Sequence, residues 1–170
     1  MKTTIQPKSI LQLVKENPDL FWNQDWYKTE KFAKTKPKKR TIHISEVPES
    51  RNKTYGEQVK LLKKGEDVPT ANEVLQAMIQ HYKETGEKLD WWIKTSDVSS
   101  RGPRVSVRFY DGRLSVHSHF FFVDLALSLL GLAARSLKPR ELEKLDSFDS
   151  SDFERRLKEL EAWKERVSNA

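Results

Sequence analysis

A stretch of 43 residues, from Thr95 to Leu137, contains no Lys, Glu, Gln, Trp or Met. These five residue types supply 48 of the 170 residues in the chain, so their joint absence marks a segment of biased composition. Strands and turns disfavour Lys and Glu, which accounts for only part of the bias. In the same region the hydrophobic period changes from about four residues to two, and this change predicts that strands replace helices.

The sequence RVSVRFYDGRLSVHSH, residues 104–119, predicts a β-hairpin. Asp111 and Gly112 occupy the turn, because Asp-Gly between alternating hydrophobic residues is the strongest short-range hairpin signal. Residues two positions apart lie on the same face of a strand, so the apolar positions of both strands are expected on one face. These positions are Val105, Val107, Phe109, Leu114 and Val116, and further strands are predicted at residues 40–47, 91–96 and 130–135.

Helix starts are marked by capping boxes, in which a Ser or Thr at the N-cap is followed three residues later by Glu. A glycine after the last periodic residue marks a helix end, because glycine adopts the left-handed conformation easily. Ser9 is a further expected N-cap, at the start of a short helix. The predicted boxes are Thr54 with Glu57, Thr70 with Glu73 and Ser151 with Glu154, and Gly65 and Gly86 are the predicted ends of the first two helices.

Length and composition predict a soluble α+β protein without disulfides. The 170 residues suffice for one domain with a core, and the lack of Cys fits a reducing compartment. The sequence has no apolar run of about 18 residues, and its start lacks the apolar core of a signal peptide. We therefore expect a cytoplasmic protein without a membrane span, with a binding domain at residues 1–137 and a helical tail at residues 138–170.

The missing set of residue types has a meaning at the level of codons. If the first two bases of a codon vary freely and the third is a pyrimidine, every amino acid is reachable except Lys, Glu, Gln, Trp and Met. Asn codons have this form, so mutation of their two adenines produces this repertoire. The segment RVSVRFYDGRLSVHSHFFFVDLALSLLGLAARS resembles the variable region of proteins diversified by diversity-generating retroelements, which mutate at adenines and often carry a hairpin and a similar closing strand.

A second resemblance concerns the fold. VPTANEVLQAM, residues 68–78, is similar to the helix start LPTEAEWE in C-type lectin domains of the formylglycine-generating-enzyme type, and WWIKTSD is similar to the strand that follows it there. The Trp of that motif is absent, and a tail follows where such proteins often end. The resemblance implies an α+β C-type lectin-like domain, with two helices against small antiparallel sheets, and the layout is also similar to that of small bacterial proteins without an assigned activity.

These resemblances imply a binding protein rather than an enzyme, with no cofactor and no metal. The ligand is expected to be a protein, because aromatic side chains give a large contact area at low entropy cost. The expected ligand-binding residues alternate along the hairpin and continue into the segment after it. They are Ser106, Arg108, Tyr110, Ser115, His117, His119, Phe120, Phe121, Phe122, Leu125 and Leu127.

The alternative function is nucleic-acid binding by a small basic protein. The net charge is +6, and the hairpin mixes Arg with aromatic residues, as proteins that bind single strands do. The basic run from Lys34 to Arg40 is expected to be an exposed loop that would contact phosphates in such a complex. An ordinary solvated surface accounts for the same charges without any nucleic acid.

Other kinds of site have weaker support in the sequence. His117 and His119 have the spacing of a metal-chelating pair on a strand, but a third ligand is not evident. The sequence has no Gly-rich phosphate loop, no zinc-binding His-Glu pair and no strained turn around a nucleophilic Ser. We therefore expect neither a metal site nor an enzyme.

Overall fold

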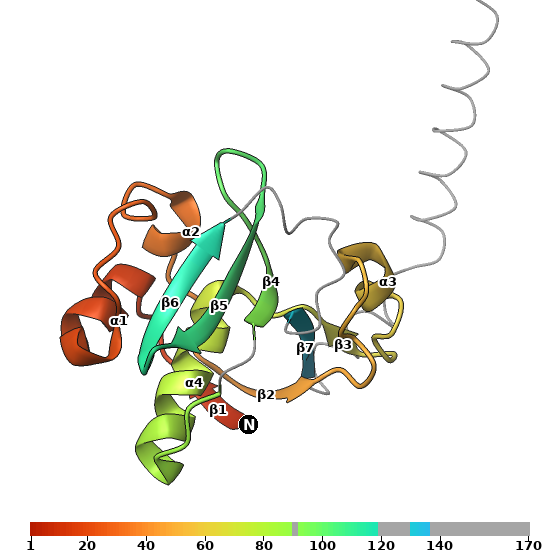
Figure 1. Cartoon of the computed structure of the whole chain (residues 1–170). Helices are drawn as coiled ribbons and strands as arrows, with labels where there is room; N and C mark the ends of the chain where they lie inside the picture. Colours follow the sequence, from red (N-terminus) through yellow and green to blue (C-terminus); the bar gives the residue numbers. More distant parts are fainter. Residues whose placement is uncertain (90–91, 119–129, 137–170) are drawn as a thin grey trace, which may run out of the picture. The chain divides into compact units, whose positions relative to one another are not determined.

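A single curled β-sheet organises the described part of the chain (Figure 1). The computed structural model describes residues 1–89, 92–118 and 130–136, all within one compact unit, Met1–Ser136. Its strands are β1 (Lys2–Ile5), β2 (Arg40–Glu46), β3 (Glu66–Asp67), β4 (Trp92–Val98), β5 (Arg104–Tyr110), β6 (Arg113–Ser118) and β7 (Leu130–Ser136). Their order in the sheet is β1-β2-β7-β4-β5-β6, and β3 pairs with β7 outside this path.

The central strand, β7, joins two groups of strands that are separate in the sequence. It pairs antiparallel with β2 on one side and parallel with β4 on the other. The mixed α+β class is confirmed, but the arrangement differs from the expected small antiparallel sheets. The difference arises because β7 enters the sheet between β2 and β4, which makes one continuous sheet with a parallel pair.

Helices begin after the predicted N-caps Ser9, Thr54 and Thr70. The side-chain and backbone hydrogen bonds of a capping box are both present at Ser9, Thr54 and Thr70, and Gly86 adopts a left-handed φ of 75° at the end of the longest described helix. The predicted Ser151 box lies outside the described residues. The helices are α1 (Ile10–Glu16), α2 (Lys31–Lys34), α3 (Tyr55–Val59) and α4 (Ala71–Thr85), with a 3-10 turn η1 at Pro18–Leu20.

The prediction that Gly65 ends the helix that begins after Thr54 is wrong. The helix α3 stops at Val59, and hydrogen-bonded turns replace it over the following residues. These turns place the adjacent Leu61 and Leu62 against one small apolar cluster that contains Leu132 of β7. Two consecutive residues of a helix point in different directions, so the turns allow a contact that a continued helix would not.

The hydrophobic core lies between α4 and one face of the sheet, which we call the inner face. Val105, Val107 and Phe109 of β5 lie on this face and are almost fully buried, as are Leu114 and Val116 of β6. The helix α4 packs against β1, β4 and β5. The predicted alternation of the hairpin is confirmed. The opposite, outer face therefore carries the other residues of the hairpin.

A buried carboxylate ties the start of α4 to two strands. Glu73 has an exposed fraction of only 1% and accepts hydrogen bonds from the backbone N–H of Thr70 at 2.9 Å and from Nη1 of Arg135 at 2.8 Å. Arg40 also pairs with Glu73, and Arg135 also pairs with Asp67. Burial acts to raise the pKa of Glu73, but the hydrogen bonds from Thr70 and Arg40 and the charges of Arg135 and Arg40 outweigh it and leave the pKa below its ordinary value.

Val107→Asp is expected to unfold the protein or to lower the free energy of unfolding by about 3 kcal/mol or more, because it buries an unpaired charge. Val98→Asp is the control, since Val98 is 48% exposed and surface substitutions usually change stability by about 0.5 kcal/mol or less. Urea denaturation followed by circular dichroism measures both. A stable Val107→Asp protein would show that the inner and outer faces are reversed.

Glu73→Gln is expected to lower the free energy of unfolding by about 3 kcal/mol near neutral pH, because the partly buried guanidinium groups of Arg40 and Arg135 lose the negative charge that they pair with. The unfolded Glu73 has its ordinary pKa of 4.5 and the folded one a lower pKa. Its contribution to stability is therefore present above about pH 4.5 and is lost as the pH falls through the folded pKa.

Urea titrations between about pH 7 and pH 3 test this dependence. The Glu73→Gln protein should lose less of its remaining stability over this range than the parent protein does. The exposed Glu84 provides the control substitution, Glu84→Gln. Equal acid sensitivity of the parent and Glu73→Gln proteins would contradict the assigned role.

Candidate ligand-binding face

The register of the hairpin brings five of the predicted binding residues together on the outer face. Ser106 of β5 lies opposite His117 of β6, and Arg108 lies opposite Ser115. Tyr110, at the end of β5, lies on the same face because it is two residues beyond Arg108. The remaining predicted residues lie outside the described part of the chain; they are His119, Phe120, Phe121, Phe122, Leu125 and Leu127.

These five residues differ greatly in exposure. Ser106 and Ser115 are buried, with exposed fractions of 6% and 2%, so they do not present their hydroxyls to a ligand in this structure. Tyr110 is 53% exposed, whereas Arg108 and His117 are half-buried. The accessible part of the predicted site is therefore at the turn end of the hairpin.

At this end two Arg side chains lie over aromatic rings. The guanidinium carbon of Arg108 is 4.9 Å from the ring centre of Trp92 and 5.0 Å from that of Tyr110. Nε of Arg108 donates a hydrogen bond to the carbonyl of Phe109 at 2.9 Å, which fixes the side chain further. The guanidinium carbon of Arg113 is 5.3 Å from the ring centre of Trp22. We call Trp22, Trp92, Arg108, Tyr110 and Arg113 the hairpin patch.

His117 is held by two neighbours on the outer face. Its ring meets the ring of Trp92 edge-on, with 4.5 Å between centres, and its Nε2 is 2.6 Å from the hydroxyl oxygen of Ser115. Among the described residues there is no group of three or more His, Cys, Asp or Glu side chains that could hold a metal ion. In this structure His117 thus supports the packing around Trp92.

An N-terminal segment, Phe21–Trp26, covers the free edge of β6. Its Trp22 N–H donates to the carbonyl of Leu114 at 3.0 Å. The Gln24 side chain accepts from the N–H of Val116 at 3.0 Å, and the Trp26 indole donates to the carbonyl of Val116 at the same distance. An uncovered edge strand would expose a row of unpaired backbone groups, so this segment both protects the sheet and brings Trp22 to the patch.

Sequence reasoning did not predict that Trp22 and Trp92 belong to the site. Trp22 is more than 80 residues before the hairpin, and its indole N–H donates to the carbonyl of Tyr110 at 2.8 Å. The aromatic content of the stretch FWNQDWY is the sequence signal that could have indicated a packed segment there. Trp92 reaches the patch because β4 pairs with β5, which a hydrophobic pattern does not reveal.

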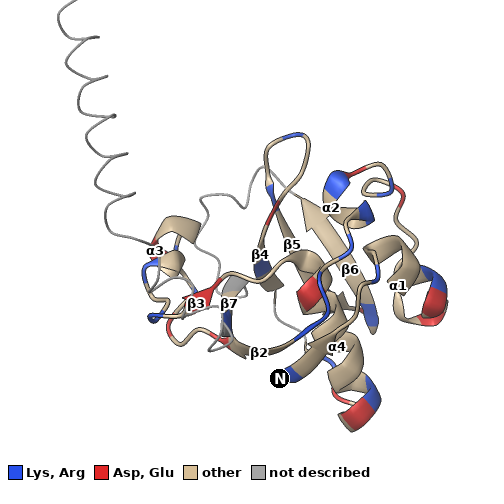
Figure 2. Cartoon of the chain, turned by 180° about the vertical axis from the view of Figure 1, so that it is seen from behind, with Lys and Arg blue, Asp and Glu red and all other residues tan. Residues whose placement is uncertain are grey.

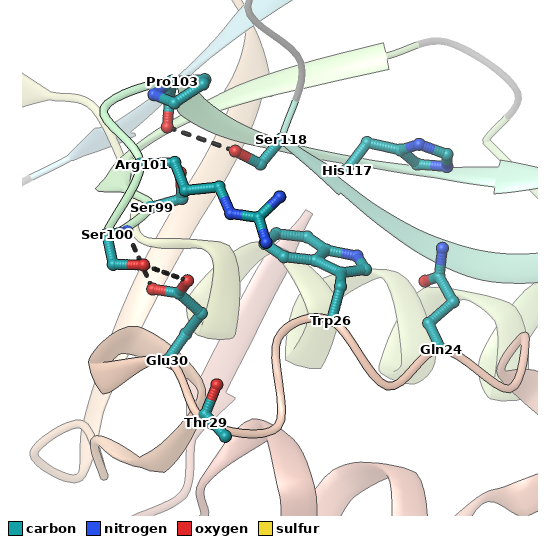
Figure 3. Close-up of a pocket in the computed structure, with 10 residues that line it drawn as sticks. All are labelled: Gln24, Trp26, Thr29, Glu30, Ser99, Ser100, Arg101, Pro103, His117 and Ser118. Carbon is teal, nitrogen blue, oxygen red and sulfur yellow. Dashed lines mark hydrogen bonds between the residues drawn. The ribbon is translucent and has the colours of Figure 1, made fainter.

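A pocket of about 580 Å³ opens beside the end of β6 (Figure 3). Glu30 bridges two of its walls by accepting hydrogen bonds from the backbone N–H of Ser100 at 2.9 Å and from its hydroxyl at 2.7 Å. These two bonds, with the charge of Arg101, hold the pKa of Glu30 below its ordinary value. The Arg101 side chain extends across the pocket toward Trp26. The lining residues are Gln24, Trp26, Thr29, Glu30, Ser99, Ser100, Arg101, Pro103, His117 and Ser118.

Comparison of the chain with protein-family models, curated proteins and solved structures gives no match. Within the described residues, no helix has the length and apolar character needed to cross a membrane.

Gln24→Ala is expected to lower the free energy of unfolding by about 1–3 kcal/mol, because the Val116 N–H and the buried Ser115 hydroxyl each lose a partner. Amide hydrogen exchange at Val116 should also become faster. The neighbouring Asn23 is exposed, so Asn23→Ala is the matched control and should change neither quantity appreciably. Unchanged exchange at Val116 in Gln24→Ala would mean that the segment does not protect this edge.

Proposed function

We propose that this protein binds a protein ligand through the hairpin patch. The observation that carries the proposal is the position of Arg108 over both Trp92 and Tyr110 at the accessible end of the hairpin. Trp, Tyr and Arg are the residues that most often carry the binding energy of protein interfaces. The patch also stands on a sheet whose inner face is packed against α4, so a partner would meet a prearranged surface.

The scaffold is proposed to be a C-type lectin-like domain of the formylglycine-generating-enzyme type. The order of elements supports this proposal, because VPTANEV leads into the capped helix α4 and WWIKTSD supplies most of β4. The hairpin and the strand LGLAAR then follow, in the order that the resemblance implies. Two features of the structure, the short α3 and the parallel pairing of β4 with β7, are not implied by the resemblance.

The outer face is further proposed to be diversified by a retroelement. The segment without Lys, Glu, Gln, Trp and Met supplies both strands of the hairpin. Apolar residues occupy its inner positions, whereas Ser, Arg, Tyr and His occupy its outer positions, which is a suitable division between scaffold and variable surface. The DNA beside the gene tests this point: a near-copy of the 3′ coding region that differs at adenines, next to a reverse transcriptase, is expected.

Tyr110→Ala is expected to reduce capture of the natural partner from native lysate at least about tenfold, because an exposed aromatic anchor is lost. Val59→Ala is the control, since Val59 is also an exposed apolar residue but lies on α3. Quantitative mass spectrometry of the captured proteins measures the effect. Recovery of the same proteins in equal amounts by all three forms would exclude the patch as the binding site.

Nucleic-acid binding is the second candidate function. Figure 2 shows basic residues along the segment between α2 and β2, and Lys36, Lys38 and Lys39 are exposed there. This segment and the Arg residues of the hairpin would provide phosphate contacts. Arg40, at the end of the run, instead pairs with buried Glu73.

A titration with single-stranded DNA at near-physiological salt distinguishes the two functions. Under the proposed function the binding is expected to be micromolar or weaker and to disappear as salt increases. Tight binding that is lost when Lys36, Lys38 and Lys39 are changed to Ala would establish the second candidate instead. Arg40 is left unchanged in this variant, because its loss would disturb the Glu73 ion pairs.

A further inference from the structure

The Arg residues of the described chain fall into two groups. Arg40, Arg51 and Arg135 all form ion pairs with carboxylates. The others form no ion pair with any carboxylate in the part of the chain that the structure describes. These four are Arg101, Arg104, Arg108 and Arg113, and all belong to the compositionally biased segment.

Aromatic rings take the place of carboxylates for three of the four Arg residues in the second group. Arg104 lies over Tyr55, with 3.7 Å between the guanidinium carbon and the ring centre, and Arg108 and Arg113 lie over the rings of the hairpin patch. Stacking restrains the guanidinium plane but consumes none of its N–H donors. The positive charge is therefore held in position. Arg104 also donates a hydrogen bond from Nη1 to the carbonyl of Ser96 at 3.1 Å, whereas the hydrogen bond of Arg108 uses Nε alone.

Two of these side chains are suitably placed for a partner. Arg113 is exposed, and Arg108 is half-buried with only its Nε engaged by a carbonyl in the described structure. The hairpin from Arg104 to Ser118 contains three Arg residues and a single acid, Asp111. The accessible end of the hairpin thus has a positive charge that its own residues do not balance.

We propose that the hairpin patch binds an acidic segment of the protein partner, with partner carboxylates paired to Arg108 and Arg113. This inference rests on the proposed function and specifies the partner's chemistry. A planar guanidinium with a free edge accepts a carboxylate through two parallel hydrogen bonds, which a Lys side chain cannot reproduce. Prior stacking lowers the entropy lost when these bonds form.

The same geometry favours carboxylates over nucleic-acid bases. A base that stacks on an aromatic ring of the patch would meet rings that Arg already contacts, because Arg108 lies over Trp92 and Tyr110, and Arg113 lies over Trp22. His117 meets the ring of Trp92 edge-on as well. A base would therefore compete with contacts that the protein has already made, whereas a carboxylate would add to them.

The probe is a fluorescein-labelled peptide of about ten Glu residues, followed by fluorescence anisotropy with the full chain. The double variant Arg108→Gln, Arg113→Gln should bind this peptide at least about tenfold more weakly than the parent. The control is Lys63→Gln, Lys64→Gln, which changes the net charge equally at two exposed residues between α3 and β3, away from the hairpin turn (Figure 1). The control should change the affinity less than about twofold, and thermal melts show whether each variant is folded.

A third variant, Arg108→Lys with Arg113→Lys, separates planar recognition from simple charge. It keeps the net charge, and we expect it to recover less than about half of the lost binding free energy. If the Lys63→Gln, Lys64→Gln variant weakens peptide binding as much as the Arg108→Gln, Arg113→Gln variant does, the attraction is non-specific and the proposal is overturned. Full recovery by Lys, or tighter binding of an oligothymidine of similar length than of the peptide, would also overturn it.

Capture of the natural partner from native lysate shows whether this inference fails alone or the proposed function fails with it. If Tyr110→Ala abolishes capture but Arg108→Gln with Arg113→Gln does not, the patch binds a protein and the acidic partner is wrong. If neither change affects capture, the proposed function itself is wrong. If the Tyr110→Ala variant and the Arg108→Gln, Arg113→Gln variant each lose capture, and the Arg variant also loses affinity for the polyglutamate peptide, the results support the proposed function and the acidic partner.

Discussion

The ion pairs of the buried Glu73 hold the sheet and its main helix in one arrangement. The carboxylate caps the start of α4 and simultaneously pairs with Arg40 at the start of β2 and with Arg135 near the end of β7. Because β7 is the strand that joins β2 to β4, this one group fixes the junction between the two halves of the sheet. A buried charge is costly without partners, so the arrangement is maintained only while all these elements are in place.

The hairpin depends on this junction through β4. The strand β5 pairs with β4, and the inner residues of β5 and β6 pack into the core that α4 closes. The outer face is then determined, because the side chains of a strand alternate between faces. The segment Phe21–Trp26 completes the hairpin by covering the edge of β6, and it supplies one of the aromatic rings of the patch.

Arginine has two different roles in this protein. In the scaffold, the charges of Arg40 and Arg135 are neutralised by buried or half-buried acids, which stabilises particular contacts between elements. In the hairpin, stacking on aromatic rings orients the guanidinium without neutralising it. Ion-paired Arg residues suit a fixed framework. Arg residues that lie over aromatic rings keep their charge, which suits a surface that binds a molecule of opposite charge.

The sequence by itself determined the local features: the N-cap at Ser9, the capping boxes at Thr54 and Thr70, the left-handed end at Gly86, and the Asp111-Gly112 turn. It also determined which hairpin residues face the core, because alternation along a strand is a local property. It failed after Val59, where contacts of Leu61 and Leu62 with β7 replaced the helix by turns.

Only the tertiary structure decided what each face meets. The insertion of β7 beside β4, the burial of Ser106 and Ser115, and the meeting of Trp22 and Trp92 with the hairpin Arg residues all join parts far apart in the chain. A periodic pattern identifies the side of a strand that is apolar, but it contains no information on the neighbouring strand. A long-range strand pairing forms only if its contacts stabilise the protein by more than the entropy lost when the chain between the strands is closed into a loop. Those contacts involve residues from several elements, so the pairing depends on the whole fold.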